Sequence, residues 1–199
     1  DKRDPLNNYK NYFYSEIDLI YFDGNSLGIL PKSTIDQTTE LIKNQWGREL
    51  IQSWNKHWFK LINDTTVHLS KMFQCNPSEL FVGESTSNNL YKVIDSLAAS
   101  KKFKTVITDS LNFPSDIYVI EEICSRNNLR FEFLKYKTDI ECEIELLKNI
   151  IQNNPNSIIS LSLVSYKSSY CYPYKALNEL CEKNNCELVW DLSLSLIHI

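Results

Sequence analysis

Residues 157–191 read SIISLSLVSYKSSYCYPYKALNELCEKNNCELVWD, and this stretch decides the fold. A strand pattern over 157–166 is followed by a helix pattern over 173–184. A second short strand, ELVWD, follows at 187–191. Two strands separated by a helix of this length are typical of an α/β domain with a mostly parallel sheet.

The same alternation extends back toward the N-terminus. Further strands are predicted at 79–83, 104–109 and 129–136, and further helices at 87–99, 115–127 and 140–152. Residues 1–20 form an arm, and an amphipathic helix follows with Ser33 or Thr34 as its N-cap. A second helix covers 55–73, and its inner face is predicted to hold Trp58, Leu61, Ile62 and Val67. The predicted fold class is α/β, with helices flanking a mostly parallel sheet behind an N-terminal helical arm.

The composition limits the partners of the chain. Of its 199 residues, 43% are hydrophobic, and the formal net charge is −4. No block of lysine and arginine stands out, so we expect neither nucleic-acid nor membrane-surface partners. No apolar run is long enough to span a bilayer, and the polar start lacks the apolar core of a signal peptide. We expect a cytoplasmic protein.

The cysteines indicate a reducing compartment. There are six, at positions 75, 124, 142, 171, 181 and 186. None forms a CxxC pair and no histidine lies at ligand spacing, so we expect free thiols and no metal site. A disulfide framework or a zinc site is the alternative.

Ligands of parallel sheets bind beyond the carboxyl ends of the strands, and three loops there carry chemistry. In GESTSNN (83–89), hydroxyl residues open a helix whose N-terminus favours an anion such as phosphate. Ordinary capping by Ser85 or Thr86 is the alternative. In LNFPSD (111–116), the ring of Phe113 could stack on a flat heterocycle, or it could be a hydrophobic staple of the next helix.

The third loop follows the last strand. Asp191 could accept a hydrogen bond from a protonated ring nitrogen, or it could be a helix cap or a surface acid. A phosphate anchor, a stacking ring and a ring-nitrogen partner, in this order, form the recognition set for pyridoxal 5′-phosphate.

Several stretches together resemble the kynureninase family. They are IYFDGNSLGILPK (20–32), WGRELIQSWNKHW (46–58), GESTSNNLYKV (83–93), NFPSDIY (112–118), LSLVSYKSSY (161–170) and VWDLS (189–193). The resemblance implies fold type I of the pyridoxal-phosphate enzymes and a homodimer. It also implies hydrolysis of kynurenine or 3-hydroxykynurenine to an anthranilate and alanine, in tryptophan catabolism and NAD synthesis.

The resemblance also implies roles for individual residues. Those expected to contact the cofactor are Ser85, Thr86, Ser87, Phe113, Pro114, Ser115, Asp116, Ser162 and Asp191. Those expected to meet the substrate are Asn25, Ser26 and Trp54, while Trp46 and Trp58 are expected to pack on helix faces.

Two departures from the family pattern stand out. Ser168-Ser169 replaces the family's Ser/Thr-Gly after the Tyr-Lys segment, and the second departure concerns the end of the chain. Leu194 stands where the family has a histidine. The lysine that holds the cofactor covalently should come farther on, and Lys92, Lys101 and Lys167 all lie in the wrong context. We therefore expect no catalytic residue in this chain and no turnover by the chain alone.

The final six residues look foreign. LSLIHI (194–199) is what CTG TCT CTT ATA CAC ATC encodes, the transposon end of common sequencing adapters, so we expect a non-native tail. The expected domains are the arm and helices (1–70), the first part of the cofactor domain (71–193) and this tail. Two rival functions stay open. One is another fold type I enzyme, such as a cysteine desulfurase-like lyase, and the other is a non-catalytic α/β binding protein.

Overall fold

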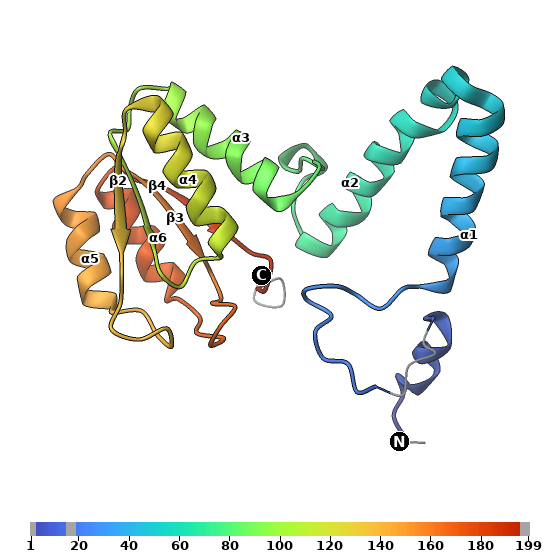
Figure 1. The fold of residues 1–199 in the computed structure, drawn as a ribbon, viewed down its shortest axis with the longest axis horizontal. Coiled ribbons are helices and arrows are strands. Elements are labelled where there is room, and N and C mark those ends of the chain that lie inside the picture. The colour runs from blue at the N-terminus through green and yellow to red at the C-terminus, as the bar shows by residue number, and fades with distance from the viewer. Residues whose placement is uncertain (1–2, 15–18, 196–199) are drawn as a thin grey trace. The chain divides into compact units, whose positions relative to one another are not determined.

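The computed structural model describes residues 3–14 and 19–195 (Figure 1). The chain divides into two compact units, Asp1–Val82 and Gly83–Ile199. Each unit is built differently, the first from helices and the second from a sheet covered by helices.

The second unit contains a four-stranded sheet. Its strands are β1 (Thr105–Asp109), β2 (Arg130–Leu134), β3 (Ile158–Ser162) and β4 (Glu187–Asp191). The strand order is β2-β1-β3-β4, and every neighbouring pair is parallel. The connecting helices are α3 (Thr86–Ala99), α4 (Pro114–Asn127), α5 (Ile144–Asn153) and α6 (Tyr174–Lys183). The expected fold class is confirmed in this unit.

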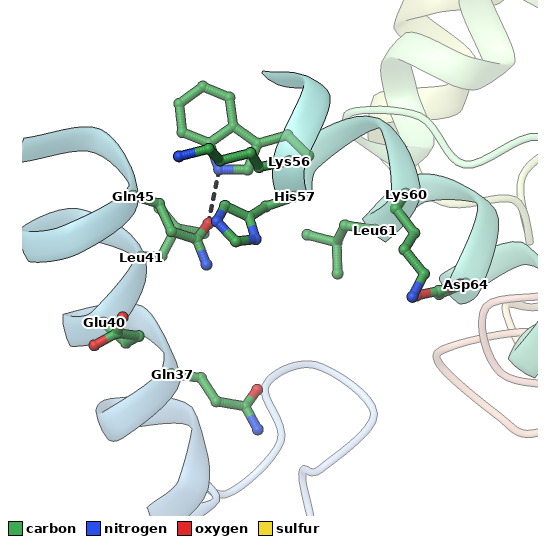
Figure 2. Close-up of a pocket in the computed structure, with 10 residues that line it drawn as sticks. Gln37, Glu40, Leu41, Gln45, Lys56, His57, Lys60, Leu61 and Asp64 are labelled. Atoms are coloured by element: carbon green, nitrogen blue, oxygen red, sulfur yellow. Dashed lines mark hydrogen bonds and ion pairs between the residues drawn. The ribbon is translucent and has the colours of Figure 1, made fainter. Parts of the chain in front are cut away.

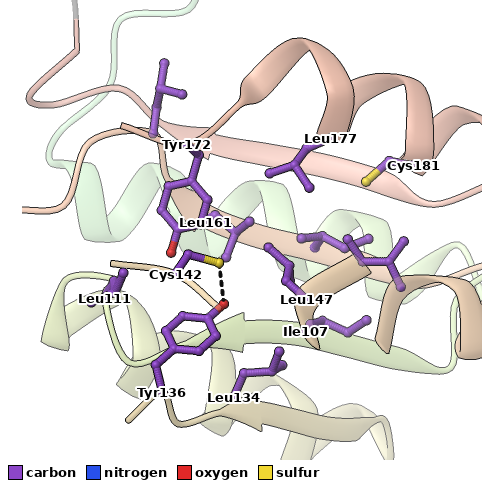
Figure 3. Packing of buried hydrophobic residues seen from close by; sticks show 13 residues of the cluster. Ile107, Leu111, Leu134, Tyr136, Cys142, Leu147, Leu161, Tyr172, Leu177 and Cys181 are labelled. Carbon is purple, nitrogen blue, oxygen red and sulfur yellow. Dashed lines mark hydrogen bonds between the residues drawn. The ribbon is translucent and has the colours of Figure 1, made fainter. Parts of the chain in front are cut away.

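The alternation of side chains along β1 and β3 explains the two helical layers. Val106 and Ile158 pack with α3 and α4, while the next residues, Ile107 and Ile159, pack with α5 and α6. Figure 3 shows the second of these clusters, in which Leu147 of α5 and Leu177 of α6 lie on the sheet. A parallel sheet that is buried on both faces needs uncharged side chains on each face. Strand β3 meets this need, because none of its five buried residues is charged.

The first unit is made of helices. Helix α1 (Lys32–Glu40) continues as a π-helix over Leu41–Glu49, and a second π-helical turn, Trp54–Trp58, leads into α2 (Phe59–Phe73). Short 3-10 turns lie at Asn7–Tyr12, Leu50–Gln52 and Pro77–Glu79. Residues 41–58 form the bend between α1 and α2 (Figure 1).

The predicted strand at 79–83 is wrong. Pro77–Glu79 is a 3-10 turn closed by a capping box with Asn76, and residues 80–83 belong to no strand of the described chain. Leu80 has extended backbone angles, φ −110° and ψ 137°. An extended segment becomes a strand only when a neighbour takes its hydrogen bonds, and the sheet pairs β1 to β4 with one another alone.

Two details of the first unit also differ from expectation. The N-cap of α1 is Pro31, not Ser33 or Thr34, so the helix begins two or three residues earlier than predicted, without a side-chain cap. The predicted inner face of α2 is not buried, since the side chains of Leu61, Ile62 and Val67 are exposed. Within the described residues of Asp1–Val82, only Ser53 and Ser70 are buried.

Candidate functional site

The carboxyl ends of β1, β3 and β4 meet at one edge of the sheet. Ser162 and Asp191 are register partners at the last position of β3 and β4. The loop that follows β1 leads into α4, whose N-cap is Phe113. The sequence therefore delivers three of its predicted cofactor contacts to one edge.

Asp191 uses its two oxygens differently. Oδ1 accepts hydrogen bonds from the backbone N–H of Ser193 at 2.8 Å and from its hydroxyl at 2.6 Å. Oδ2 lies 3.3 Å from the hydroxyl oxygen of Ser162. The carboxylate is half-buried at the strand end, so the turn fixes it in place while one oxygen faces the site.

Phe113 is held by its backbone with much of its ring exposed. Its angles are φ −68° and ψ 139°, as an N-cap requires, and 47% of the residue is exposed. The ring meets that of Tyr166 edge-on, with centroids 5.1 Å apart. A hydrophobic staple uses the residue before the N-cap, so the alternative of a staple does not hold for Phe113. Its ring is available for stacking.

Asp116 is the most unusual group at this edge. Pro114 and Ser115 begin α4, and Asp116 follows in its first turn, only 2% exposed. Its Oδ1 accepts from the Ser115 hydroxyl at 3.2 Å, but Oδ2 is buried with no hydrogen-bond partner among the described residues. Burial, and secondly the negative charge of Asp191, raise the pKa of Asp116 to about 6. A buried acid with one oxygen unpaired, next to a second acid, is suited to a cationic ligand.

The start of α3 is arranged around Ser85. Its side chain caps the helix by accepting from the backbone N–H of Asn88 at 3.2 Å, so the capping alternative is correct for this residue. Thr86 is exposed and Ser87 is half-buried in the first turn, where backbone N–H groups have no intrahelical partner. Capping by Ser85 thus leaves hydroxyls and amides for an anion.

Gly83 lies close to the side chain of Asn89 in this helix start. A Cβ atom there would lie 2.1 Å from Oδ1 of Asn89, far inside contact distance. That oxygen is buried and has no hydrogen-bond partner in the described chain. The close approach fixes the entry of the chain into α3.

Sequence reasoning missed a buried acid behind this edge. Asp109, at the end of β1, accepts from the hydroxyls of Tyr172 at 2.7 Å and Tyr136 at 2.9 Å, and from the backbone N–H of Leu111 at 3.0 Å. The thiol of Cys142 donates to Tyr136 at 3.1 Å (Figure 3). Burial raises the pKa of Asp109, although both tyrosine hydroxyls oppose that rise. No local sequence pattern reveals these hydrogen bonds, because Tyr172 lies 63 residues from Asp109 in the chain.

The three predicted substrate residues belong to the other unit. Asn25 is exposed, and the hydroxyl of Ser26 donates to Asp23 at 2.8 Å. The ring of Trp54 meets those of Trp58 at 5.2 Å and Phe59 at 5.4 Å. Trp58 packs as expected, whereas Trp46 is 63% exposed and does not.

An open pocket also lies in the first unit, between α1 and the start of α2 (Figure 2). His57 and Trp58 line it, and Oε1 of Gln45 accepts from the Trp58 indole at 2.8 Å. Glu49 lies 2.8 Å from the His57 ring, and the histidine and a nearby lysine, Lys56, lower the pKa of Glu49. The pocket contains none of the predicted site residues.

The sequence predicts free cysteines and no metal site. All six cysteines are free thiols, as predicted. Among the described residues, no group of three histidine, cysteine or acidic side chains could hold a metal ion. No helix in the same ranges has the length and apolarity to cross a membrane.

The family of the chain follows from its match to a known protein family. Residues 20–199 match the family Aminotransferase class-V. The chain belongs to the class-V aminotransferase family. Its curated relatives include proteins named kynureninase. That of Pseudomonas fluorescens is 28% identical and that of Deinococcus radiodurans is 26% identical. Both alignments cover 98% of this chain but only 47% of the relative, so the chain spans about half the length of these relatives.

Solved structures show the fold of this class-V chain at lower identity. A mutant of C-DES with glycine covalently linked to its PLP cofactor is 15% identical and superposes with a TM-score of 0.80, over 94% of this chain and 50% of that one. The cysteine desulfurase CsdA of Escherichia coli is 12% identical, with a TM-score of 0.77 over 97% of this chain and 50% of its own. The predicted fold type is thereby confirmed.

Proposed function

We propose that the whole protein is a kynureninase, which hydrolyses the Cβ–Cγ bond of kynurenine or 3-hydroxykynurenine to give an anthranilate and alanine. The observation that supports this proposal most directly is the set of side chains at the carboxyl ends of β1, β3 and β4. The charge of Asp191 acts on Asp116, and Phe113, whose ring is exposed, is the N-cap of the helix in which Asp116 lies, in a chain whose relatives are named kynureninase. Cysteine desulfurases share the fold, but a likeness of 12% to 16% carries no reaction.

The residues of Gly83–Ile199 fit pyridoxal 5′-phosphate as the cofactor. Asp191 would accept the ring N–H, Phe113 would stack on the ring, and the first turn of α3 with Thr86 and Ser87 would hold the phosphate. When bound, the cofactor withdraws electrons from the amino-acid carbon next to its imine link. The orphaned oxygen of Asp116 supports this assignment, because a cationic ring would offset its buried charge.

The roles of this chain's residues are binding and orientation. Asp191 keeps the ring nitrogen protonated, and Phe113 fixes the plane of the ring. Ser26 and Trp54 are proposed to contact the substrate, with Asn25 nearby. Lys92 lies 2.5 Å from Glu84 and Lys167 lies 2.7 Å from Asp139, in positions that suit surface ion pairs. We therefore propose that the chain alone binds the cofactor without turnover.

The setting of the enzyme is part of the same proposal. It would act in the cytoplasm, in tryptophan catabolism and NAD synthesis, which agrees with its six free thiols. It would work as a homodimer, and the exposed apolar side chains of the first unit, including Leu61 and Ile62, support a partner surface there.

The test is a product assay on the protein expressed with the coding sequence that follows the Ser193 codon. With pyridoxal phosphate, we expect kynurenine to give anthranilate and alanine in equal amounts, and cysteine to give no sulfide. Sulfide from cysteine without anthranilate would establish the lyase instead. The 199-residue chain, assayed in parallel, should release no anthranilate.

A further inference from the structure

Asn112 is the centre of a buried polar network at the cofactor edge. Its Nδ2 donates to the Thr108 hydroxyl at 3.0 Å and to the carbonyl of Ser160 at 3.3 Å. Its Oδ1 accepts from the backbone N–H of Phe113 at 2.9 Å and from the Ser162 hydroxyl at 2.6 Å. Asn112 is 2% exposed, and its amide makes four hydrogen bonds, two as donor and two as acceptor.

The orientation of this amide is fixed by its neighbours. The backbone N–H of Phe113 can only donate, so the atom facing it must be Oδ1. The carbonyl of Ser160 can only accept, so the atom facing it must be Nδ2. A flipped amide would lose both bonds, and Asn112 therefore presents an acceptor to Ser162.

The hydroxyl of Ser162 has one proton, and two acceptors lie within hydrogen-bond distance of it. Oδ1 of Asn112 lies at 2.6 Å and Oδ2 of Asp191 at 3.3 Å. The shorter and better bond takes the proton to Asn112. With its proton on Asn112, the Ser162 hydroxyl would no longer donate to Oδ2 of Asp191, the second acceptor within reach at 3.3 Å.

We propose that Asn112 is a positioning residue that draws the Ser162 proton away from Asp191, so that Oδ2 of Asp191 stays a free acceptor for a cationic ring N–H. This rests on the proposed cofactor, but the direction of the proton is a property of the chain itself. A carboxylate oxygen without a donor is the stronger acceptor, and the nearby Asp116 adds to the negative charge. The same amide holds the backbone of Phe113, so one side chain orders both ring contacts.

The first experiment needs no cofactor. The chain is labelled with carbon-13 at the aspartate carboxyls, and the Asp191 signal is assigned with Asp191→Asn. We expect Ser162→Ala to leave this signal in place, because the hydroxyl donates nothing to Asp191. Asn112→Ala should shift the signal, because the freed hydroxyl turns to Asp191, and the double variant Asn112→Ala/Ser162→Ala should restore it.

The controls separate this role from a structural one. Asn127→Ala, which removes an amide at the far end of α4, should leave the Asp191 signal unchanged. General damage by Asn112→Ala would persist in the double variant, and that result would overturn the proposal. A shift of the Asp191 signal in Ser162→Ala would also overturn the proposal, because it would show that the Ser162 hydroxyl donates to Asp191.

A second experiment follows the effect to the ring. With pyridoxamine 5′-phosphate labelled with nitrogen-15 in the ring, the ring-nitrogen pKa in Asn112→Ala should fall by about half to one unit, roughly three- to tenfold in proton affinity. The double variant should return it to the wild-type value, and an equal fall in both would contradict the proposal. Failure of the unmodified chain to bind this probe would count against the proposed function, while the carboxyl signals would still decide the role of Asn112.

Discussion

At the scale of single residues, the proposed cofactor site contains two acids close enough for the charge of one to act on the other. Asp191 is anchored by Ser193 through one oxygen, and Asp116 is buried with one oxygen unpaired. Strand ends can be located in a sequence, so the local pattern alone places Asp191 and Phe113 at the ligand edge. It places Asn112 there as well, but it does not reveal the hydrogen bonds of Asn112, because the partners Ser160 and Ser162 are 48 and 50 residues away.

The raised pKa of Asp116 predicts how stability depends on pH. Its ordinary value is 3.8 and its folded value is about 6, so the folded state holds the proton more tightly. Between these values the unfolded chain ionises first, and stability falls as pH rises; above about pH 6 the loss is constant. Asp116→Asn should therefore stabilise the chain by about 3 kcal/mol near pH 7 and by much less near pH 4. Urea unfolding at both pH values measures this, and an equal effect at both would contradict it.

Asp191 should contribute a charge-assisted hydrogen bond to the cofactor ring. Asp191→Ala is expected to weaken the binding of pyridoxamine 5′-phosphate by at least about tenfold, because such bonds contribute about 1.5–3 kcal/mol. Glu187→Gln is the matched control, since it removes an acid from the other end of the same strand. Equal affinities of the two variants, measured by fluorescence titration, would place the ring elsewhere.

At the scale of elements, the strands and helices of Gly83–Ile199 follow the periodicity of the sequence closely. The predicted strand at 79–83 fails because a strand is defined by its neighbour, and hydrogen-bond partners cannot be seen in a local pattern. The buried strand residues, such as Val106 and Ile107, could be predicted because both faces of the sheet are covered and the run is apolar throughout.

A side chain at Gly83 should destabilise the entry into α3 by displacing Asn89. Gly83→Ala places a Cβ 2.1 Å from Asn89, so Asn89 or the backbone must move. We expect a loss of about 1–3 kcal/mol in unfolding free energy. Gly24→Ala, where nothing lies within 4 Å of the added atom, should cost much less. Thermal unfolding of both variants measures the difference, and equal losses would refute the packing account.

The loop between β3 and α6 is tied to β1 through Asp109. Tyr172→Phe removes one of its hydroxyl donors and leaves a buried acid short of a partner. The expected cost is about 1–3 kcal/mol, while Tyr170→Phe, at a half-buried neighbour, should change little. Denaturant midpoints of the two variants test this, and the outcome against it is an unchanged midpoint for Tyr172→Phe.

At the scale of the whole molecule, the fold class and the family could be predicted because motifs and periodicity agreed along most of the chain. The exposure of the apolar side chains in the first unit could not be predicted. Its helices have apolar positions at helical spacing, but the side chains of Leu61, Ile62 and Trp46 are exposed. Periodicity shows which face of a helix needs a partner and not where the partner comes from.

The central claim is that residues 83–191 form a site for pyridoxal phosphate. The most direct measurement is a calorimetric titration of the chain with pyridoxamine 5′-phosphate, and with pyridoxamine as the matched ligand without phosphate. We predict saturable one-to-one binding of the phosphorylated ligand, and binding of pyridoxamine at least about tenfold weaker, since the start of α3 would hold the phosphate. Absence of saturable binding, or equal affinity for the two ligands, would contradict the account.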